Sequence, residues 1–292
     1  MIETILTAIA PVMLTALIGY FWTRSGRSIE AHGLTQIVTE IGTPCLVFST
    51  FAKMSVPAGA FAVTAAASLT ILIGFLIVAT LVLKLCGLRL RTYLPSMAFP
   101  NTGNLGIPLA LYAFGQEGLA YAIVFLCFTS VMNFTIGQAI AAGTMSWRAI
   151  IKMPIIYAVA LGLVVTETGI VLPQFLINTI GLLGSITVPL MLLMLGVSLG
   201  SLRVAAFPRA FMLSLLRVGM GAGLGFAVTA FFGLTGAARA SVIMQSSMPA
   251  AVFNYLFALR YQNQPEEVAG IVVVSTLVTI ATAPALLYFL LG

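Results

Sequence analysis

AFPNTGNLGIP, residues 98–108, interrupts an apolar segment that is otherwise long enough to span a membrane. Proline removes a backbone donor and clashes with the preceding helical turn, and glycine loosens the same turn. In lipid, a broken backbone is tolerated only where it is buried in protein or lines a polar cavity. A helix broken this strongly at mid-membrane therefore predicts a place where something binds.

A second interruption, QSSMP at residues 245–249, lies at the corresponding place in the other half of the chain. Broken helices in matching positions of two halves are typical of secondary transporters, whose substrates bind near the middle of the membrane. The pair of interruptions thus predicts both an internal duplication and a transport function.

The composition places the whole chain in a membrane. Of its 292 residues, 61% are hydrophobic and 7% are charged, whereas roughly a quarter of the residues in a soluble domain are charged. Apolar runs of about 20 residues, the length that crosses a bilayer, recur along the chain. We predict an all-α integral membrane protein with ten spans, at 4–22, 34–53, 60–86, 93–114, 117–142, 153–167, 174–201, 207–233, 237–260 and 266–291.

The basic residues are distributed unevenly between the loops. Lys53 and Arg239 lie on one side, and Arg217 lies inside the eighth span. The opposite side holds Arg24, Arg27, Lys84, Arg89, Arg91, Arg148, Lys152, Arg203, Arg209 and Arg260. Cytoplasmic loops carry the excess of Lys and Arg. This pattern predicts a multi-pass protein of the inner (plasma) membrane with both termini on the non-cytoplasmic side, and it explains the net charge of +6 without a nucleic-acid partner.

Ten spans divide into five and five, at residues 1–143 and 144–292. An odd number of spans in each half forces the second half to insert upside down. Pro44 in the second span matches Pro189 in the seventh, and Pro100 in the fourth matches Pro249 in the ninth. Span parity, charge pattern and proline spacing together favour an inverted repeat.

Catalytic chemistry has few candidate residues in this chain. It contains no aspartate, its one histidine is His32 in a predicted loop, and Cys45, Cys86 and Cys127 show no metal-binding spacing. We therefore expect no enzyme activity, no cofactor and no metal site. Without a phosphate-binding loop motif, ATP is not expected to be the energy source in this chain.

Two strings resemble a known family. FPNTGNLGIPLALYAFG, residues 99–115, resembles the fourth helix of the auxin efflux carrier family, which includes plant PIN-type carriers and bacterial malonate or malate carriers. MPAAVFNYLFALRYQNQPEEVAGIVVVSTLV, residues 248–278, resembles the ninth and tenth helices of that family. About ten residues separate the fifth and sixth spans, so the chain resembles compact prokaryotic members.

The resemblance implies a ten-helix fold of inverted repeats, similar to that of bile-acid symporters and sodium–proton antiporters. The broken fourth and ninth helices would cross at Pro100 and Pro249. Spans one, two, six and seven would form a scaffold and often a homodimer interface, whereas spans three to five and eight to ten would form the moving transport domain.

The breaks also predict the chemistry of the site. Asn101 and Thr102 are good N-cap residues for one half-helix, and a second half-helix is expected to begin beyond Ser246 and Ser247, with Pro249 in its first turn. Helix N-termini carry partial positive charge and unpaired N–H groups that bind carboxylates and phosphates. We therefore expect a small organic anion to bind at Pro100, Asn101, Thr102, Gly103, Asn104, Gln245, Ser246, Ser247, Pro249 and Asn254.

Arg217 is a second candidate for the anion, because a cation inside a membrane span is by default a functional group. The alternative is an ion pair with Glu40, the most deeply embedded acid. Glu40 is also the candidate for proton coupling. A uniporter, a proton- or sodium-coupled symporter and, more remotely, a membrane receptor that transports nothing all remain compatible with these residues.

Overall fold

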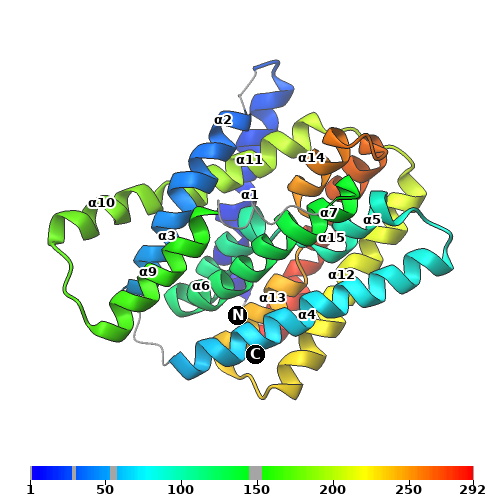
Figure 1. Ribbon diagram of the computed structural model, residues 1–292. Helices are drawn as coiled ribbons and strands as arrows, with labels where there is room; N and C mark the ends of the chain where they lie inside the picture. Colours follow the sequence, from blue (N-terminus) through cyan, green and yellow to red (C-terminus); the bar gives the residue numbers. More distant parts are fainter. Residues whose placement is uncertain (1, 28–30, 53–57, 145–152, 292) are drawn as a thin grey trace.

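The computed structural model describes residues 2–27, 31–52, 58–144 and 153–291 (Figure 1), and the regular structure in these ranges is helical. The first half contains α1 (Ile2–Arg24), α2 (Ala31–Gln36), η1 (Ile37–Gly42), α3 (Thr43–Ala52), α4 (Ala58–Leu85), α5 (Leu90–Ala98), η2 (Thr102–Gly106), α6 (Ile107–Met132), η3 (Asn133–Gly137) and α7 (Gln138–Ala142). The second half contains α9 (Pro154–Thr168), α10 (Gln174–Ser185), α11 (Thr187–Ser201), α12 (Phe207–Phe231), α13 (Gly236–Ser246), α14 (Val252–Arg260) and α15 (Pro265–Leu291). The all-α prediction is confirmed for these ranges.

Six helices of the described chain are long and apolar enough to cross a membrane, at Ile5–Arg24, Gly59–Leu85, Thr102–Ala142, Gln174–Ser201, Phe207–Phe231 and Pro265–Leu291. The other predicted spans are shorter or interrupted. α9 has 15 residues, and the spans at 93–114 and 237–260 break where the two polar motifs fall. The count of ten spans and the inverted repeat stay predictions.

The longest of these segments contains a turn. Gly115 has φ 67° and ψ −158° and divides α6 into two helical parts. Glycine reaches this conformation without the steric cost that a side chain would add. The turn falls between the predicted fourth and fifth spans, so the boundary predicted from the sequence lies at the observed interruption.

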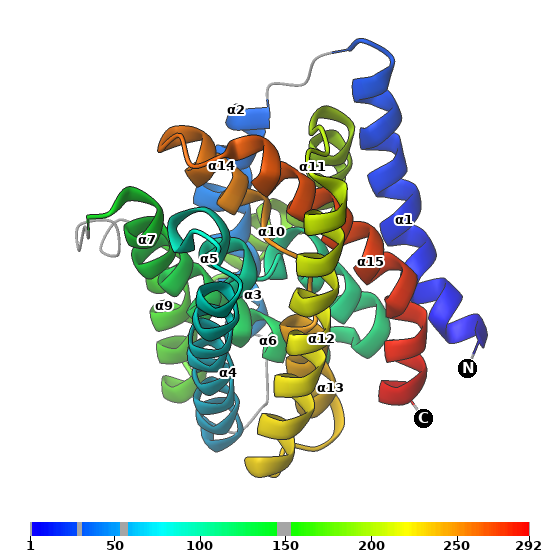
Figure 2. The same cartoon turned by 90° about the vertical axis from the view of Figure 1, so that its right-hand side faces the viewer.

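The helices pack in two groups. In one group, α1 runs along α11 and α3 runs along α9, with α10 against α3. Close approach is possible because Gly196 of α11 has no side chain where it faces the backbone of Ala16. In the other group, α12 packs against α4, α13 and α15, and α4 and α12 lie on the face turned to the viewer in Figure 2. Parts of α6 contact both groups.

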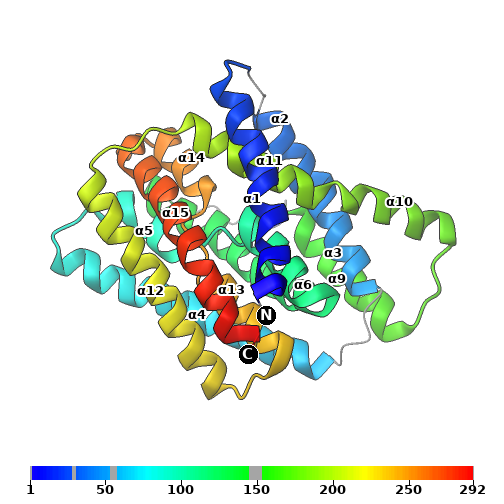
Figure 3. The ribbon, with the colours of Figure 1, turned by 180° about the vertical axis from the view of Figure 1, so that it is seen from behind.

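Both termini lie at one end of the molecule, where α1 contacts α15 (Figure 3). The turns between α4 and α5, between α11 and α12, and between α14 and α15 lie toward the right and top of Figure 1, away from the termini. These turns and the helix ends beside them carry Lys84, Arg89, Arg203, Arg209 and Arg260. The fold therefore separates the termini from these five predicted cytoplasmic charges, as a positive-inside arrangement requires. Arg148 and Lys152, which are predicted on the same side, lie outside the described residues.

Candidate functional site

The two polar motifs break their helices and pair with each other. Asn101 donates its backbone N–H to the carbonyl of Pro249 at 2.7 Å, and Ala251 donates to the carbonyl of Phe99 at 3.1 Å. These bonds flank an antiparallel bridge at Pro100. The breaks leave backbone groups without helical partners, and a buried chain must satisfy them. Each break therefore satisfies the other, and we call this paired region the crossing.

Asn101 begins the helical segment that follows the first break. Its side-chain oxygen accepts a hydrogen bond from the backbone N–H of Asn104 at 3.2 Å, so it caps η2 as predicted. The side chain is 5% exposed, and its Nδ2 has no hydrogen-bond partner in the described chain. Because the cap occupies the oxygen, the NH₂ group remains as a buried donor beside the crossing.

Two further buried amides lie at the crossing. Asn254 of α14 donates Nδ2 to the carbonyl of Phe99 at 3.1 Å, and its Oδ1 has no partner among the described residues. Gln245 of α13 is fully buried, and neither of its amide atoms has a partner there. Its Oε1 lies 2.1 Å from the place where a Cβ on Gly106 would stand, so a side chain at that position would displace the Gln245 amide. The site is therefore neutral, buried and rich in amide groups.

The second half-helix begins later than predicted. α13 ends at Ser246 and α14 begins at Val252, so the predicted half-helix N-terminus at Ser247–Pro249 is wrong. The hydroxyls of Ser246 and Ser247 both bond back to the carbonyl of Ile243, at 2.9 and 2.7 Å. Serine competes for backbone carbonyls in this way inside and at the ends of helices. The two serine hydroxyls thus bond within the last turn of α13, at its C-terminus.

Arg217 of α12 lies next to the end of α13 at the crossing and is fully buried. Its Nη2 donates to the carbonyl of Ser246 at 3.1 Å, and its guanidinium carbon lies 4.3 Å from the centre of the Phe75 ring. Nε and Nη1 have no hydrogen-bond partner among the residues that the structure places. Arg217 therefore contacts the C-terminus of α13, where the helix dipole favours a cation.

The alternative pairing of Arg217 with Glu40 is wrong. Glu40 lies in η1 with an exposed side chain. Among the described residues, the ion pair is instead formed by Arg209 and Glu267. The Nη1 of Arg209 lies 2.8 Å from the Oε2 of Glu267. Glu40 lies in η1, which contacts α3, α9, α10 and α11 and so belongs to a different helix group from the crossing.

The glycines at positions 219, 221, 223 and 225 of α12 lie in two different environments. A Cβ on Gly221 would stand 2.2 Å from the carbonyl oxygen of Ser246, and one on Gly225 would stand 2.4 Å from its hydroxyl oxygen. Gly219 and Gly223 meet nothing within 4 Å. Of the two overlapping GxxxG patterns that these glycines form, therefore, the one formed by Gly221 and Gly225 packs against α13, and small residues of this kind permit close helix packing in membranes.

The partly exposed side of the crossing is at η2. Gly103 and Asn104 are half-buried, whereas Thr102 is 2% exposed. A Cβ on Gly103 would stand 3.8 Å from the terminal methyl of Met191, so α11 of the other helix group covers this side. The sequence did not predict three residues that contact the crossing. Phe99 and Ala251 contribute backbone groups and Met191 contributes an apolar contact, and neither kind of contribution produces a recognisable sequence motif.

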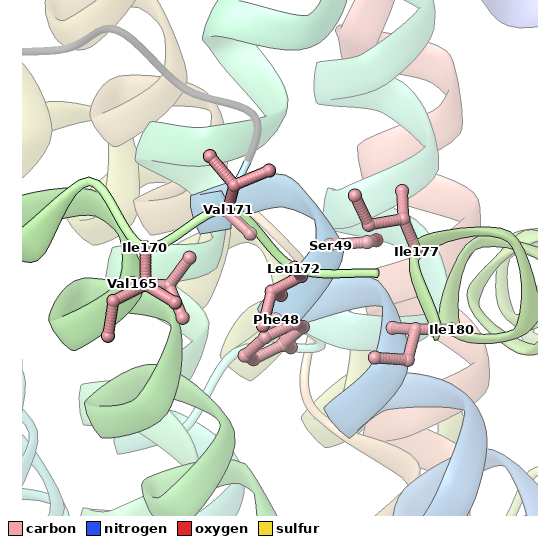
Figure 4. A pocket seen from close by; sticks show the side chains of 9 residues that line it. Phe48, Ser49, Val165, Ile170, Val171, Leu172, Ile177 and Ile180 are labelled. Carbon is pink, nitrogen blue, oxygen red and sulfur yellow. The ribbon is translucent and has the colours of Figure 1, made fainter. Parts of the chain in front are cut away.

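A cavity of about 220 Å³ lies elsewhere, between α3, α9 and α10 (Figure 4). Its lining is aliphatic and aromatic apart from Ser49, whose hydroxyl bonds the carbonyl of Leu46 at 3.0 Å. An apolar cavity offers nothing to a small anion. The crossing, with its unpaired amides, is therefore the better candidate site.

A helical membrane protein with paired broken helices around buried amides is the architecture of a carrier. The chain matches the family model described as "Membrane transport protein" at residues 4–143 and 138–287, and it belongs to this family, which includes the auxin efflux carriers that it resembles. It is a membrane transporter and not an enzyme.

Its relatives include two archaeal proteins, each described as an uncharacterized transporter. The protein from Methanocaldococcus jannaschii is 26% identical over 287 residues, which cover 91% of this chain and 92% of the relative. The protein from Methanothermobacter thermautotrophicus is 28% identical over 199 residues, which cover 64% of each chain. Both matches agree with a compact prokaryotic member of the family.

Proposed function

We propose that this transporter is a secondary carrier for a small organic anion, such as a dicarboxylate or an auxin-like acid. The observation that carries the proposal is the buried amide NH₂ of Asn101, which has no partner beside the paired breaks. A carboxylate is the complementary acceptor, and hydrogen bonds with an ionised partner are the stronger kind. No acidic side chain occurs in either break to oppose it.

The substrate would bind between the N-terminal end of η2 and the side of α11 that covers it. From one half, the free NH₂ group of Asn101 would supply the donor, and Pro100, Thr102, Gly103 and Asn104 would line the site beside it. Gln245 and Asn254 would contribute buried amide groups from the other half, next to Ser246, Ser247 and Pro249, and Arg217 would act through its contact with the end of α13. The half-buried positions in η2 support this entry side.

Alternating access would follow from the two helix groups. The group around α1, α3, α9 and α11 would form the scaffold, and the group around the crossing would move past it as an elevator. This division is supported by the close pairing of α1 with α11 and of α3 with α9. A homodimer through the scaffold helices, with membrane lipid around it, would keep the scaffold still while the other group moves.

Coupling to membrane potential alone fits the site best, because the crossing contains no titrating carboxylate. A proton- or sodium-coupled symporter is the alternative, with Glu40 as the proton site. The exposed position of Glu40 outside the crossing gives that alternative no direct support.

The proposal is tested by a thermal-shift screen of the purified protein, followed by uptake into proteoliposomes. The panel contains acetate, malonate, malate, succinate and indole-3-acetate, with the amide malonamide as the uncharged control. We expect at least one acid to stabilise the protein and to be taken up, and malonamide to do neither. Equal stabilisation by malonamide, or no uptake of any acid, would contradict an anion carrier.

A further inference from the structure

Arg217 places a full positive charge inside the helix group that holds the crossing. A guanidinium group stays protonated in proteins, and this one is fully buried. The glutamates that the structure places are exposed, apart from Glu267, which is half-buried and paired with Arg209. No acid in the described chain therefore balances the charge of Arg217.

The groups that stabilise this charge do not cancel it. The carbonyl of Ser246 accepts from Nη2 at 3.1 Å, and the face of Phe75 lies 4.3 Å from the guanidinium carbon. A carbonyl dipole and an aromatic face attract a cation, but neither carries a formal charge. The contacts leave one net positive charge beside the crossing.

Arg217 lies in the same helix group as the crossing. α12 packs against α4, α13 and α15. Gly221, one helical turn beyond Arg217, sits directly against the backbone of Ser246. A movement of the crossing relative to α1, α3, α9 and α11 would carry Arg217 with it.

We propose that Arg217 is the fixed countercharge of the transported anion, an inference that rests on the alternating-access carrier proposed above. With a monoanion bound, the buried charge of Arg217 is balanced, and without one the interior of the moving group carries one uncompensated positive charge. Membrane voltage then acts on the return of the empty carrier, because a charge that crosses the field gains or loses energy in proportion to the potential. Exchange of one monoanion for another moves no net charge.

Voltage steps test this without any substrate. The purified protein is reconstituted into giant liposomes in sodium chloride and held by patch clamp, and the transient currents after each step are integrated. We expect the wild-type protein to show a saturating charge movement of up to about one elementary charge per protein. Arg217→Lys keeps the charge and should keep this movement, whereas Arg217→Met should abolish it.

A second pair of variants covers the case in which Arg217→Met does not fold. Met220 is 9% exposed and lies three residues after Arg217 on α12, so the two side chains are neighbours. Met220→Glu should neutralise the arginine and abolish the charge movement, and Met220→Gln, of similar shape, should retain it. An unchanged movement in Met220→Glu would overturn the proposal.

Uptake of radiolabelled malonate and indole-3-acetate by the same wild-type preparation distinguishes a failure of the role proposed for Arg217 from a failure of the proposed carrier function. Uptake without any charge movement would refute the role of Arg217 and leave the carrier intact. Charge movement that Arg217→Met preserves would refute it as well. Failure of uptake for every acid in the panel, with charge movement present, would instead reject the proposed substrate class.

Discussion

At the scale of single residues, Asn101 has two tasks that a substitution can separate. Its oxygen caps η2 through the N–H of Asn104, and its NH₂ group is the free donor. Asn101→Asp retains a good capping oxygen but removes the donor and adds a negative charge. We expect a folded protein in which η2 is still capped and no measurable binding of the best acid from the screen.

Asn101→Ala is the matched comparison, because it removes the cap and the donor together without adding charge. Loss of one hydrogen bond to a charged ligand is worth about 1.5–3 kcal/mol, or roughly 10- to 150-fold in the dissociation constant. Loss of the cap should also lower stability by about 1 kcal/mol. Binding of the acid to Asn101→Asp at wild-type affinity, measured by calorimetry, would place the anion elsewhere.

Gly221 and Gly219 offer a second test at this scale, since they lie on one helix in different surroundings. A methyl group on Gly221 meets the carbonyl of Ser246, whereas one on Gly219 meets open space. Gly221→Ala should destabilise the protein by about 1–3 kcal/mol through overpacking. Gly219→Ala should be neutral or stabilising by up to about 1 kcal/mol, because alanine favours a helix.

The two glycine variants are compared by thermal unfolding in one detergent, with the wild type alongside. If both lower the melting temperature equally, the close contact between α12 and the end of α13 is not what limits substitution at Gly221.

At the scale of elements, the bridge between the two breaks is held by two backbone bonds, one of which Ala251→Pro can remove. Ala251 has φ −68°, which proline adopts without strain, and its N–H donates to the carbonyl of Phe99. Removal of that donor should cost about 0.5–1.5 kcal/mol of stability. Ala251→Gly, which keeps the donor, is the control, and a proline variant as stable as that control would mean that the bridge contributes nothing.

The elements also show why the two breaks differ. In the first, a capping asparagine starts η2 three residues after α5 ends at Ala98. In the second, α13 ends on two serines bonded back to Ile243, and α14 starts at Val252 without a side-chain cap. The first break therefore offers the free NH₂ group of Asn101 at η2, whereas the second offers the buried amide of Gln245 and the C-terminus of α13, which Arg217 stabilises.

At the scale of the whole molecule, the arrangement of termini and basic turns makes a topology prediction. Both termini lie together, away from the turns that carry Arg89, Arg203 and Arg260. Because basic loops stay in the cytoplasm, an alkaline phosphatase fused to the C-terminus should be active and a fluorescent protein there should be dark. The reverse result would place the termini in the cytoplasm and remove the argument for ten spans.

Much of this description could be predicted from the sequence, because it depends on local chemistry. A high apolar fraction leaves membrane helices as the stable structure. Pro100 and the glycines after it break a helix wherever it lies, and Asn101 prefers to cap the next one. The turn at Gly115 and the break after Ser246 follow from the same conformational preferences. These helix breaks, caps and turns depend on neighbouring residues in the sequence and not on contacts with distant parts of the chain.

Only the tertiary structure decided which groups meet. The pairing of Phe99 with Ala251 joins backbone atoms, which no side-chain pattern reveals. The contact of Arg217 with Ser246, in place of Glu40, depends on how α12 packs against α13. The start of α14 at Val252 followed from serines that satisfied the preceding helix. In each case a buried polar group bonds to a partner that lies close in space. Separation along the sequence does not determine which groups are close in space, so the sequence alone could not predict these partners.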